Sequence, residues 1–384
     1  MKTNRVDSPQ YALDRFDPDR MTFARELRGF SKKELAGKVN KTPSAISQIE
    51  RGVITPDLET FISLAFALQV PPSFFTIKEE FSNRIDMTAC HFRALRSTPQ
   101  VMRRKSARKG DLLIDLLELL EAKGVLFPVE DVSGFNSALT DTDLEIEQTA
   151  NKLRKYWKMG TGPIPDIVKL VESRGVFVLP IDESCSKVDA YSTWRAKRPC
   201  IMLSNDKPAS RIRFDIGHEL GHLVMHEESS TGEKRIEKQA NRFAGAFLAP
   251  MDSFLEECPR SWSLSAFQQL KFRWRMSIQA LLYRAKDLRC ISQSTHQRAM
   301  IQLTKLNMRK CEGPEWDVER PVLLSQALDL LSDDTTLREL AADLSVHSAE
   351  LRDMLVPCVS REILDKIDRK NEADNNSIVQ LRKD

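Results

Sequence analysis

The chain has 384 residues, a formal net charge of +3 and seven cysteines. This length predicts two or three domains that each bury a core, and so small a net charge does not by itself indicate any class of partner, as a local basic cluster would. The cysteines form no C-x-x-C pair, which favours reduced thiols over a disulfide framework. Neither a signal peptide nor an apolar run of the roughly 20 residues that span a bilayer is evident. We therefore expect a cytoplasmic protein with no membrane contact.

The N-terminal part has the pattern of a small helical domain. We expect residues 1–17 to form a flexible arm and residues 18–76 to form a bundle of five short helices. Ser31 and Glu34 form a capping box at the start of one helix. After a tight turn, Pro43 begins a second helix. Two helices joined in this way form a helix-turn-helix, whose second helix can enter the major groove of DNA.

The runs 34–36, 46–52 and 56–70 closely resemble the Xre (Cro/C1-type) family of DNA-binding domains. The resemblance implies a double-stranded DNA operator as a partner. Gln48 is then placed to bind an adenine through two hydrogen bonds. A helical bundle used for protein contacts is the alternative. The further base-facing candidates that the resemblance implies are Ser44, Ala45 and Ser47, and the phosphate-binding candidates are Lys41, Thr42 and Arg51.

We expect residues 77–140 to connect this domain to the next one. Residues 90–96 have the pattern of an edge or linking strand. The apolar helix predicted at 112–120 suits either packing on the following domain or dimerisation, and we expect a homodimer. A basic cluster begins within this strand and continues up to the helix. It is dense enough to hold a nucleic-acid backbone, although a solvated linker is the alternative. The cluster consists of Arg93, Arg96, Arg103, Arg104, Lys105, Arg108 and Lys109.

Residues 141–255 contain the pattern His218-Glu219-x-x-His222. Residues four apart share one face of a helix, so both imidazoles can bind one ion. Zn²⁺ accepts imidazole and carboxylate ligands and keeps one position for water. Glu219 can act as the general base toward that water. Gly217 and Gly221 are costly inside a helix, which indicates that another element packs closely against them.

The third ligand is expected on a second helical run. Glu237 is the best candidate, and Asn241 lies four residues later on the same face. Asn241 can accept a hydrogen bond from the far ring nitrogen of a ligand histidine. His226, one further helical step beyond His222, is the alternative ligand.

The span from about residue 160 to residue 250 resembles the ImmA/IrrE family of zinc metallopeptidases. The resemblance implies a zincin-like domain in which His218, His222 and Glu237 bind Zn²⁺ and Glu219 is the catalytic carboxylate. The segments that carry it are 162–164, 200–205, 213–214, 218–222, 237–244 and 248–250.

The overall fold class that we expect is mainly α with a small mixed sheet (α+β). In the peptidase region the patterns predict helices at 143–157 and 164–173 and strands at 176–179, 190–194 and 199–203. Strands that precede a metal-binding helix can align an extended substrate by backbone pairing, and residues 201–204 are our candidate for that role.

Residues 256–368 are expected to form a helical C-terminal domain, followed by a disordered tail at 369–384. Part of this region, from Glu339 to Met354, repeats the apolar spacing that begins at Glu34, at one constant offset. Its surface is acidic, with Asp343 among the exposed candidates. We therefore interpret the repeat as core periodicity and not as a second DNA reader.

These features together predict a transcriptional regulator that carries a zinc endopeptidase. The resemblance implies a protein substrate, a repressor or antitoxin, with another Xre-type repressor as one candidate. Its cleavage would derepress stress, mobile-element or defence genes. Tyr191 or His226 can stabilise the oxyanion, and the sequence does not decide between them. The alternative is a non-proteolytic transcription factor whose peptidase-like domain senses a ligand or metal.

A latent protease needs an occupant for the open zinc position. A thiolate is a strong zinc ligand, so Cys185 and Cys200 are our candidates for a thiol latch, with Cys185 in a loop before the metal helix and Cys200 beside the expected substrate strand. The alternative is that both are ordinary thiols.

Overall fold

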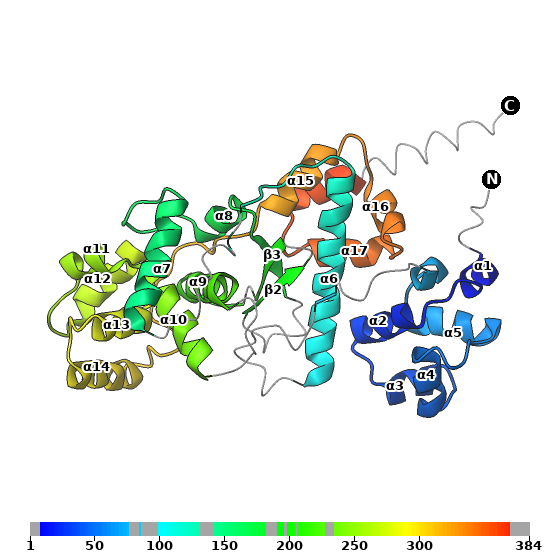
Figure 1. The fold of residues 1–384 in the computed structure, drawn as a ribbon, viewed down its shortest axis with the longest axis horizontal. Helices are drawn as coiled ribbons and strands as arrows, with labels where there is room; N and C mark the ends of the chain where they lie inside the picture. Colours follow the sequence, from blue (N-terminus) through cyan, green and yellow to red (C-terminus); the bar gives the residue numbers. More distant parts are fainter. Residues whose placement is uncertain are drawn as a thin grey trace.

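The computed structural model describes residues 8–76, 84–85, 99–130, 132, 142–181, 190–195, 198–204, 206–226 and 234–368. These residues form a mainly helical protein with one three-stranded mixed sheet, which confirms the expected α+β class (Figure 1). None of the described helices is long and apolar enough to cross a bilayer. The expected strand at 90–96, the loop with Cys185 and the tail at 369–384 lie outside the described residues.

The N-terminal bundle has the five expected helical segments, and its helices begin where the capping patterns indicate. The capping box of Ser31 and Glu34 is formed. Thr42 caps the following helix, because its hydroxyl accepts a hydrogen bond from the backbone N–H of Ala45 at 3.1 Å. The segments are α2 (Pro18–Arg28), α3 (Lys32–Lys38), α4 (Pro43–Glu50), α5 (Leu58–Leu68) and the 3₁₀ helix η2 (Pro72–Thr76).

Part of the expected flexible arm belongs to this bundle. Residues Pro9–Leu13 form α1, which packs on η2 and α5. The side chain of Ala12 is fully buried, and the ring of Phe16 lies 5.9 Å from that of Phe61 between centroids. The prediction of a loose arm was wrong for these residues, because a few apolar side chains among many polar ones are enough to complete a core edge.

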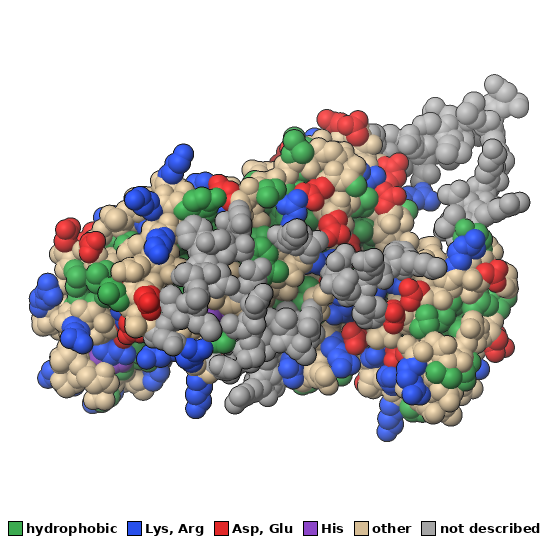
Figure 2. Space-filling view, viewed as in Figure 1, with side chains coloured by type: hydrophobic (Ala, Val, Ile, Leu, Met, Phe, Trp, Pro, Cys, Tyr) green, Lys and Arg blue, Asp and Glu red, His purple; other side chains and the backbone are tan. Residues whose placement is uncertain are grey.

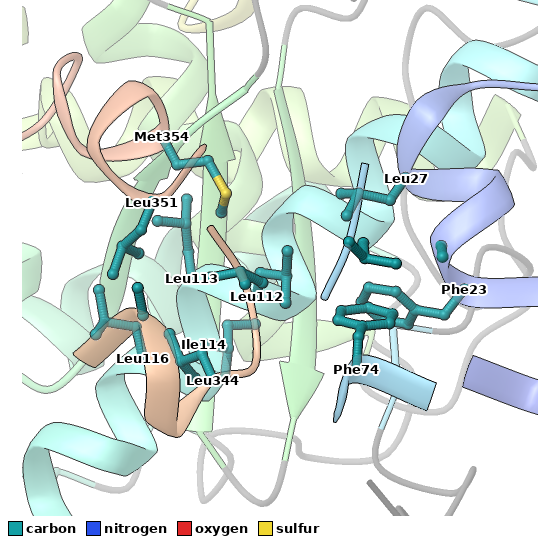
Figure 3. Packing of buried hydrophobic residues seen from close by; sticks show 14 of the residues in the cluster. Phe23, Leu27, Phe74, Leu112, Leu113, Ile114, Leu116, Leu344, Leu351 and Met354 are labelled. Carbon is teal, nitrogen blue, oxygen red and sulfur yellow. The ribbon is translucent and has the colours of Figure 1, made fainter. Parts of the chain in front are cut away.

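A long helix, α6 (Gln100–Ala122), lies between the N-terminal bundle and the rest of the molecule. On one side it packs against α2, and Figure 3 shows Phe23 and Leu27 of α2 facing it. On its other side lie the sheet and the helices near the C-terminus. The apolar helix expected at 112–120 is therefore confirmed, and its buried residues pack within the chain, with Leu112 and Leu116 among them.

The sheet has the strand order β1-β3-β2. Strand β3 (Arg198–Leu203) pairs in parallel with β1 (Phe177–Pro180) and antiparallel with β2 (Ala190–Arg195). Cys200 and Met202 belong to the apolar cluster that includes α6, whereas Ile201 and Leu203 belong to the cluster of the opposite face. Because β3 has neighbours on both sides, it offers no free edge to a substrate. Among the described strands, β1 and β2 are the two edge strands, and β2 packs on α9.

Two helices that pack tightly on each other form a layer on the second face of the sheet, and the first of them contacts β2 and β3 directly. They are α9 (Ala209–Met225), which carries the histidine pattern, and α10 (Lys234–Leu248). A Cβ atom on Gly217 would lie 3.4 Å from Ala244, and one on Gly221 would lie 3.0 Å from the ring of Phe243. The expectation that another element packs against both glycines is therefore confirmed. Helices α7 (Asp143–Tyr156) and α8 (Ile167–Glu172) complete this layer.

The expected C-terminal helical domain divides between two apolar clusters. Its first half packs with α9 and α10. A buried ion pair also joins this half to α7, with Nη2 of Arg284 2.8 Å from the carboxylate of Glu147. Its second half packs on α6. The first half comprises α11 (Met251–Glu257), α12 (Leu264–Trp274), α13 (Ile278–Asp287) and α14 (Gln293–Lys305), and the second comprises α15 (Leu323–Leu331), α16 (Leu337–Asp343) and α17 (Ser348–Leu355).

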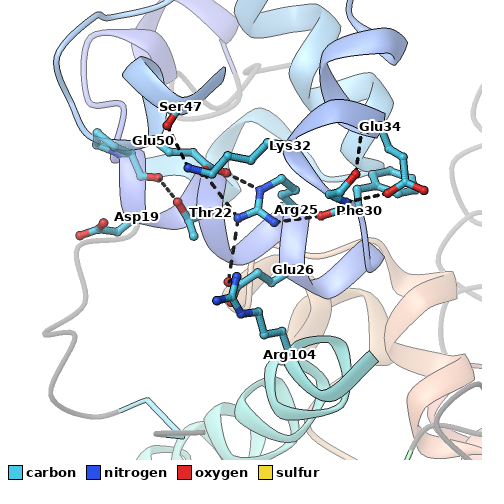
Figure 4. A network of polar contacts seen from close by, with 12 residues as sticks. Asp19, Thr22, Arg25, Glu26, Phe30, Lys32, Glu34, Ser47, Glu50 and Arg104 are labelled. Carbon is cyan, nitrogen blue, oxygen red and sulfur yellow. Dashed lines mark hydrogen bonds and ion pairs between the residues drawn. The ribbon is translucent and has the colours of Figure 1, made fainter. Parts of the chain in front are cut away.

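The described part of the basic cluster serves domain contact. Arg104 lies 3.3 Å and Arg108 3.5 Å from the carboxylate of Glu26 on α2, and the side chain of Lys105 packs on Gly29. Figure 4 shows Arg104 of α6 reaching Glu26. The hypothesis of a nucleic-acid site is thus not supported at these residues, because their charges are matched by a segment distant in sequence.

The buried carboxylate of Asp111 joins α6 to β2, and its loss should destabilise the fold. It lies 3.0 Å from Arg108 and 3.7 Å from Arg195, and its side chain is 1% exposed. We expect Asp111→Ala to lower the free energy of unfolding by about 3–5 kcal/mol, because two buried guanidinium groups lose a counterion. The control is Glu118→Ala, whose side chain is 43% exposed and 3.9 Å from Arg195; it should cost less than about 1 kcal/mol. Urea unfolding of both variants tests this, and equal losses would contradict it.

Candidate metal centre and DNA-binding surface

Three predicted ligands converge at the contact of α9 and α10. The Nε2 atoms of His218 and His222 are 3.0 Å apart. The carboxylate of Glu237 lies 3.4 Å from the first and 3.5 Å from the second. Among the described residues these are the only three His, Cys, Asp or Glu side chains that come together in this way, with all donor atoms within 4.8 Å.

Asn241 fixes the orientation of His218. Its amide nitrogen donates to the carbonyl of Glu237 at 2.8 Å, so its Oδ1 is the acceptor that faces Nδ1 of His218 at 3.2 Å. The proton of His218 therefore lies on Nδ1, and the lone pair of Nε2 points to the centre. This is the contact expected of Asn241 from the sequence.

His226 supports His222 from behind and does not join the ligand group. Its Nε2 donates to Oε1 of Gln239 at 3.0 Å. Its Nδ1 then accepts from Nδ1 of His222 at 3.2 Å, which leaves the lone pair of His222 Nε2 free for a cation. Sequence reasoning missed this role for Gln239, although its spacing of two residues from Glu237 places it on the same helix.

The donor set fits zinc. Tetrahedral ligands about 2.0–2.1 Å from a zinc ion lie about 3.3 Å from each other, close to the three separations found here. With both protons on Nδ1, the two Nε2 lone pairs face each other, and a cation between them removes that repulsion. Oε1 of Glu237 is buried and has no hydrogen-bond partner. Burial raises the pKa of Glu237, but when the two histidines are protonated on Nε2 their hydrogen bonds and charge outweigh burial and hold that pKa below its usual range.

Glu219 lies beside this group and is almost completely buried. Oγ of Ser192, on β2, donates to Oε2 of Glu219 at 2.7 Å. Burial raises the pKa of Glu219 to about 7, while the charge of His218 and the bond from Ser192 lower it. Sequence reasoning missed Ser192. The alternation of side chains along the strand, in which Ala190 faces α9, could have indicated it.

Other candidates lie away from the ligands. Tyr191 belongs to the apolar cluster that contains α6, on the opposite face of β2 from Ser192, so the structure does not support it as an oxyanion ligand. Cys200 also faces that cluster, and burial raises the pKa of its thiol to about 12. It is therefore neither near the ligands nor a ready thiolate. Cys185 lies outside the described residues.

The base-facing candidates lie on α4, at the surface of the N-terminal bundle. Ser44 is exposed, and Ala45, Ser47 and Gln48 are half-buried. The hydroxyl of Ser47 accepts a hydrogen bond from Lys32 at 3.1 Å, within the polar network of Figure 4. Of the phosphate candidates, Lys41, Thr42 and Arg51 are all exposed, with Thr42 also serving as the cap of α4.

Comparisons with known families agree with this arrangement. Residues 171–286, which include α9 and α10, match the IrrE N-terminal-like domain. Residues 23–75 match the helix-turn-helix domain. The chain therefore contains an Xre-type helix-turn-helix domain followed by an IrrE/ImmA-like metallopeptidase-type domain, in the predicted order. No curated protein matches the chain.

The ligand prediction is tested by metal content. The purified protein should hold about one zinc ion per chain, because three protein ligands and one water complete a tetrahedron. We expect His222→Ala and Glu237→Gln to lose the metal and Glu219→Gln to keep it, as measured by elemental analysis. Asn241→Ala should weaken zinc binding by about 10- to 100-fold. Retention by Glu237→Gln with loss from Glu219→Gln would overturn the assignment.

Proposed function

We propose that this chain is a DNA-binding transcriptional regulator with zinc-dependent endopeptidase activity. Its substrate would be a repressor or antitoxin protein, whose cleavage derepresses stress, mobile-element or defence genes in the cytoplasm. In this proposal the DNA-binding domain occupies residues 18–76, and the peptidase domain begins near residue 141.

The observation that carries the proposal is the position of Glu219 beside the three converging donors. A site that only senses metal has no need of an extra buried carboxylate next to its ligands. Here that carboxylate is held by a hydrogen bond from Ser192 and lies close enough to His218 for the charge of a protonated imidazole to lower its pKa. This arrangement is what a general base requires.

Each side chain has a definite part in the reaction. His218, His222 and Glu237 would hold the ion. Zinc, when bound, acts as a Lewis acid that makes water a nucleophile at neutral pH and polarises a peptide carbonyl. The carboxylate of Glu219 takes a proton from that water and later delivers it to the leaving amine. Ser192 fixes the carboxylate through the hydrogen bond to Oε2, so that its other oxygen is free for this transfer.

The sheet supports β2 as the strand that aligns the substrate. The sequence-based candidate, 201–204, lies on β3, which is paired on both sides. Strand β2 carries Ser192 and packs on α9. An extended substrate paired with its edge would therefore run beside Glu219.

The protease prediction compares the wild type with Glu219→Gln and Ser192→Ala on candidate Xre-type repressors. We expect Glu219→Gln to lower kcat by about 10²–10⁴-fold, the usual contribution of a general base, and Ser192→Ala to lower kcat with little change in KM. Both should keep their zinc, because neither residue is a ligand. Gel analysis of cleavage products provides the measurement. Normal gene regulation by Glu219→Gln would instead favour the non-proteolytic sensor.

The DNA prediction concerns Gln48. With an operator selected from random duplexes, Gln48→Ala should reduce discrimination against random DNA by about 1–3 kcal/mol, because a two-bond contact to adenine is lost. Arg51→Ala should weaken binding to all sequences and reduce the salt dependence. The exposed Gln10 of α1 provides the control, and Gln10→Ala should bind as the wild type does. Unchanged discrimination in Gln48→Ala would remove it from the base-reading set.

A further inference from the structure

Helices α16 and α17 repeat the helix-turn-helix of α3 and α4. The two units correspond residue for residue at one constant offset, from Lys32–Lys38 to Leu337–Asp343 and from Pro43–Glu50 to Ser348–Leu355. Both first helices begin with a formed capping box, which in the second unit joins Thr336 to Glu339. The interpretation of this repeat as core periodicity alone was therefore too narrow.

The turns and the cores correspond as well. Asn40 and Ser345 occupy the same place in the two turns and both have left-handed backbone, with φ of 50° and 54°. The next residue in each unit donates its N–H to a carbonyl of the first helix, at 2.9 Å and 2.8 Å. The matching core positions are buried in both units: Leu35, Ala36, Val39, Ile46 and Ile49 in the first, and Leu340, Ala341, Leu344, Leu351 and Met354 in the second.

The surface that reads DNA in the first unit has a different chemistry in the second. Glu350 stands where the first unit has Ala45, and Asp353 stands where it has Gln48. The positions of Lys41 and Arg51 are occupied by valines. Figure 2 shows acidic side chains over the region of α15 and α16. Carboxylates repel phosphates, and Arg352, which stands where the first unit has Ser47, is paired with Asp365 at 3.0 Å, so this face is not suited to hold a DNA backbone.

Glu350 binds the N-terminal bundle. Both of its oxygens contact the guanidinium of Arg28 on α2, with Nη2 2.5 Å from Oε2. The two side chains are only 15% and 12% exposed. Arg28 also donates to the carbonyls of Leu68 and Gln69, at 2.6 Å and 2.8 Å, at the end of α5. A two-bond arginine–carboxylate pair fixes direction as well as distance.

We propose that the α16–α17 unit is a second helix-turn-helix whose reading helix docks the DNA-binding domain of the same chain. Its apolar side packs on α6, and Asp343 is anchored there by Lys123 at 2.8 Å. The side of α17 that corresponds to the base-facing side of α4 binds Arg28 through Glu350. The N-terminal bundle is thus held by α6 through Glu26 and by α17 through Arg28. Because Ser44 remains exposed, docking fixes the orientation of the DNA reader without covering it.

The test is a charge swap read by hydrogen–deuterium exchange of the full chain. Glu350→Arg and Arg28→Glu should each speed amide exchange at the C-terminal half of α2 and at residues 68–70 by about fivefold, the factor that corresponds to about 1 kcal/mol of coupling. The double variant should exchange more slowly than Arg28→Glu, because the pair forms with its charges exchanged, but it should not reach the wild-type rate at residues 68–70, because a glutamate at position 28 cannot donate to the carbonyls of Leu68 and Gln69. This proposal is independent of any peptidase activity.

The matched control is Lys366→Glu, which reverses a charge of the C-terminal region whose partner is Asp329 of α15 at 3.1 Å. It should leave exchange in α2 unchanged. Wild-type exchange in both single variants, or exchange in α2 of the double variant as fast as in Arg28→Glu, would overturn the docking role.

A second measurement asks whether α17 reads DNA. Arg352 stands where the first unit has Ser47 and is paired with Asp365 at 3.0 Å. We expect Arg352→Ala to bind a random-sequence duplex as the wild type does, whereas Arg51→Ala binds it less tightly. The reverse result would make α17 a DNA reader and refute the proposal.

Discussion

The rest of the structure depends on the buried carboxylate of Asp111. It accepts the backbone N–H of Ile85 at 2.9 Å and pairs with Arg108 of α6 and Arg195 of β2. Burial raises the pKa of Asp111, whereas the charges of both arginines lower it. A charge so enclosed is stable only while its partners stay in place, so the position of α6 on the sheet is narrowly defined.

The position of α6 on the sheet affects both the DNA-binding domain and the candidate metal centre, and strand β2 connects the two. Side chains of β2 alternate between faces, so Arg195 and Tyr191 turn to α6 while Ser192 turns to Glu219. On its far side α6 carries the N-terminal bundle. Two elements, α6 and β2, therefore lie between the DNA-binding surface and the candidate catalytic carboxylate. The ion pairs of Arg195 with Asp111 and Asp115 join these two elements directly.

The sequence predicts what depends on neighbours along the chain. Capping residues locate the helix starts at Ser31 and Thr42, and the i, i+4 spacing places His218 and His222 on one face. A motif that carries its own geometry can be identified from residue types and spacing alone. The convergence of Glu237 on these histidines followed from helix spacing together with family resemblance.

What the sequence does not predict depends on partners distant along the chain. Strand order is of this kind: the alternation of side chains predicts which faces are buried but not which strands are neighbours, so it does not reveal that residues 201–204 lie on the central strand. The pairing of Arg104 and Arg108 with Glu26 is of the same kind, because Glu26 lies far from both arginines in the sequence. Ser192 gave no signal of its own, because a lone serine in a strand is common and only its contact with Glu219 distinguishes it.

The composition of α10 has a consequence for how the molecule responds to its surroundings. This one helix supplies a candidate ligand, Glu237, and the supports of both histidines, Asn241 directly and Gln239 through His226. An ion that binds only when α10 is seated on α9 adds its binding free energy to that seating, by an amount that grows with the logarithm of metal concentration. With zinc bound as proposed, the supply of metal in the cell would set how firmly this part of the protein is folded, and scarcity would expose the helix pair to unfolding and degradation.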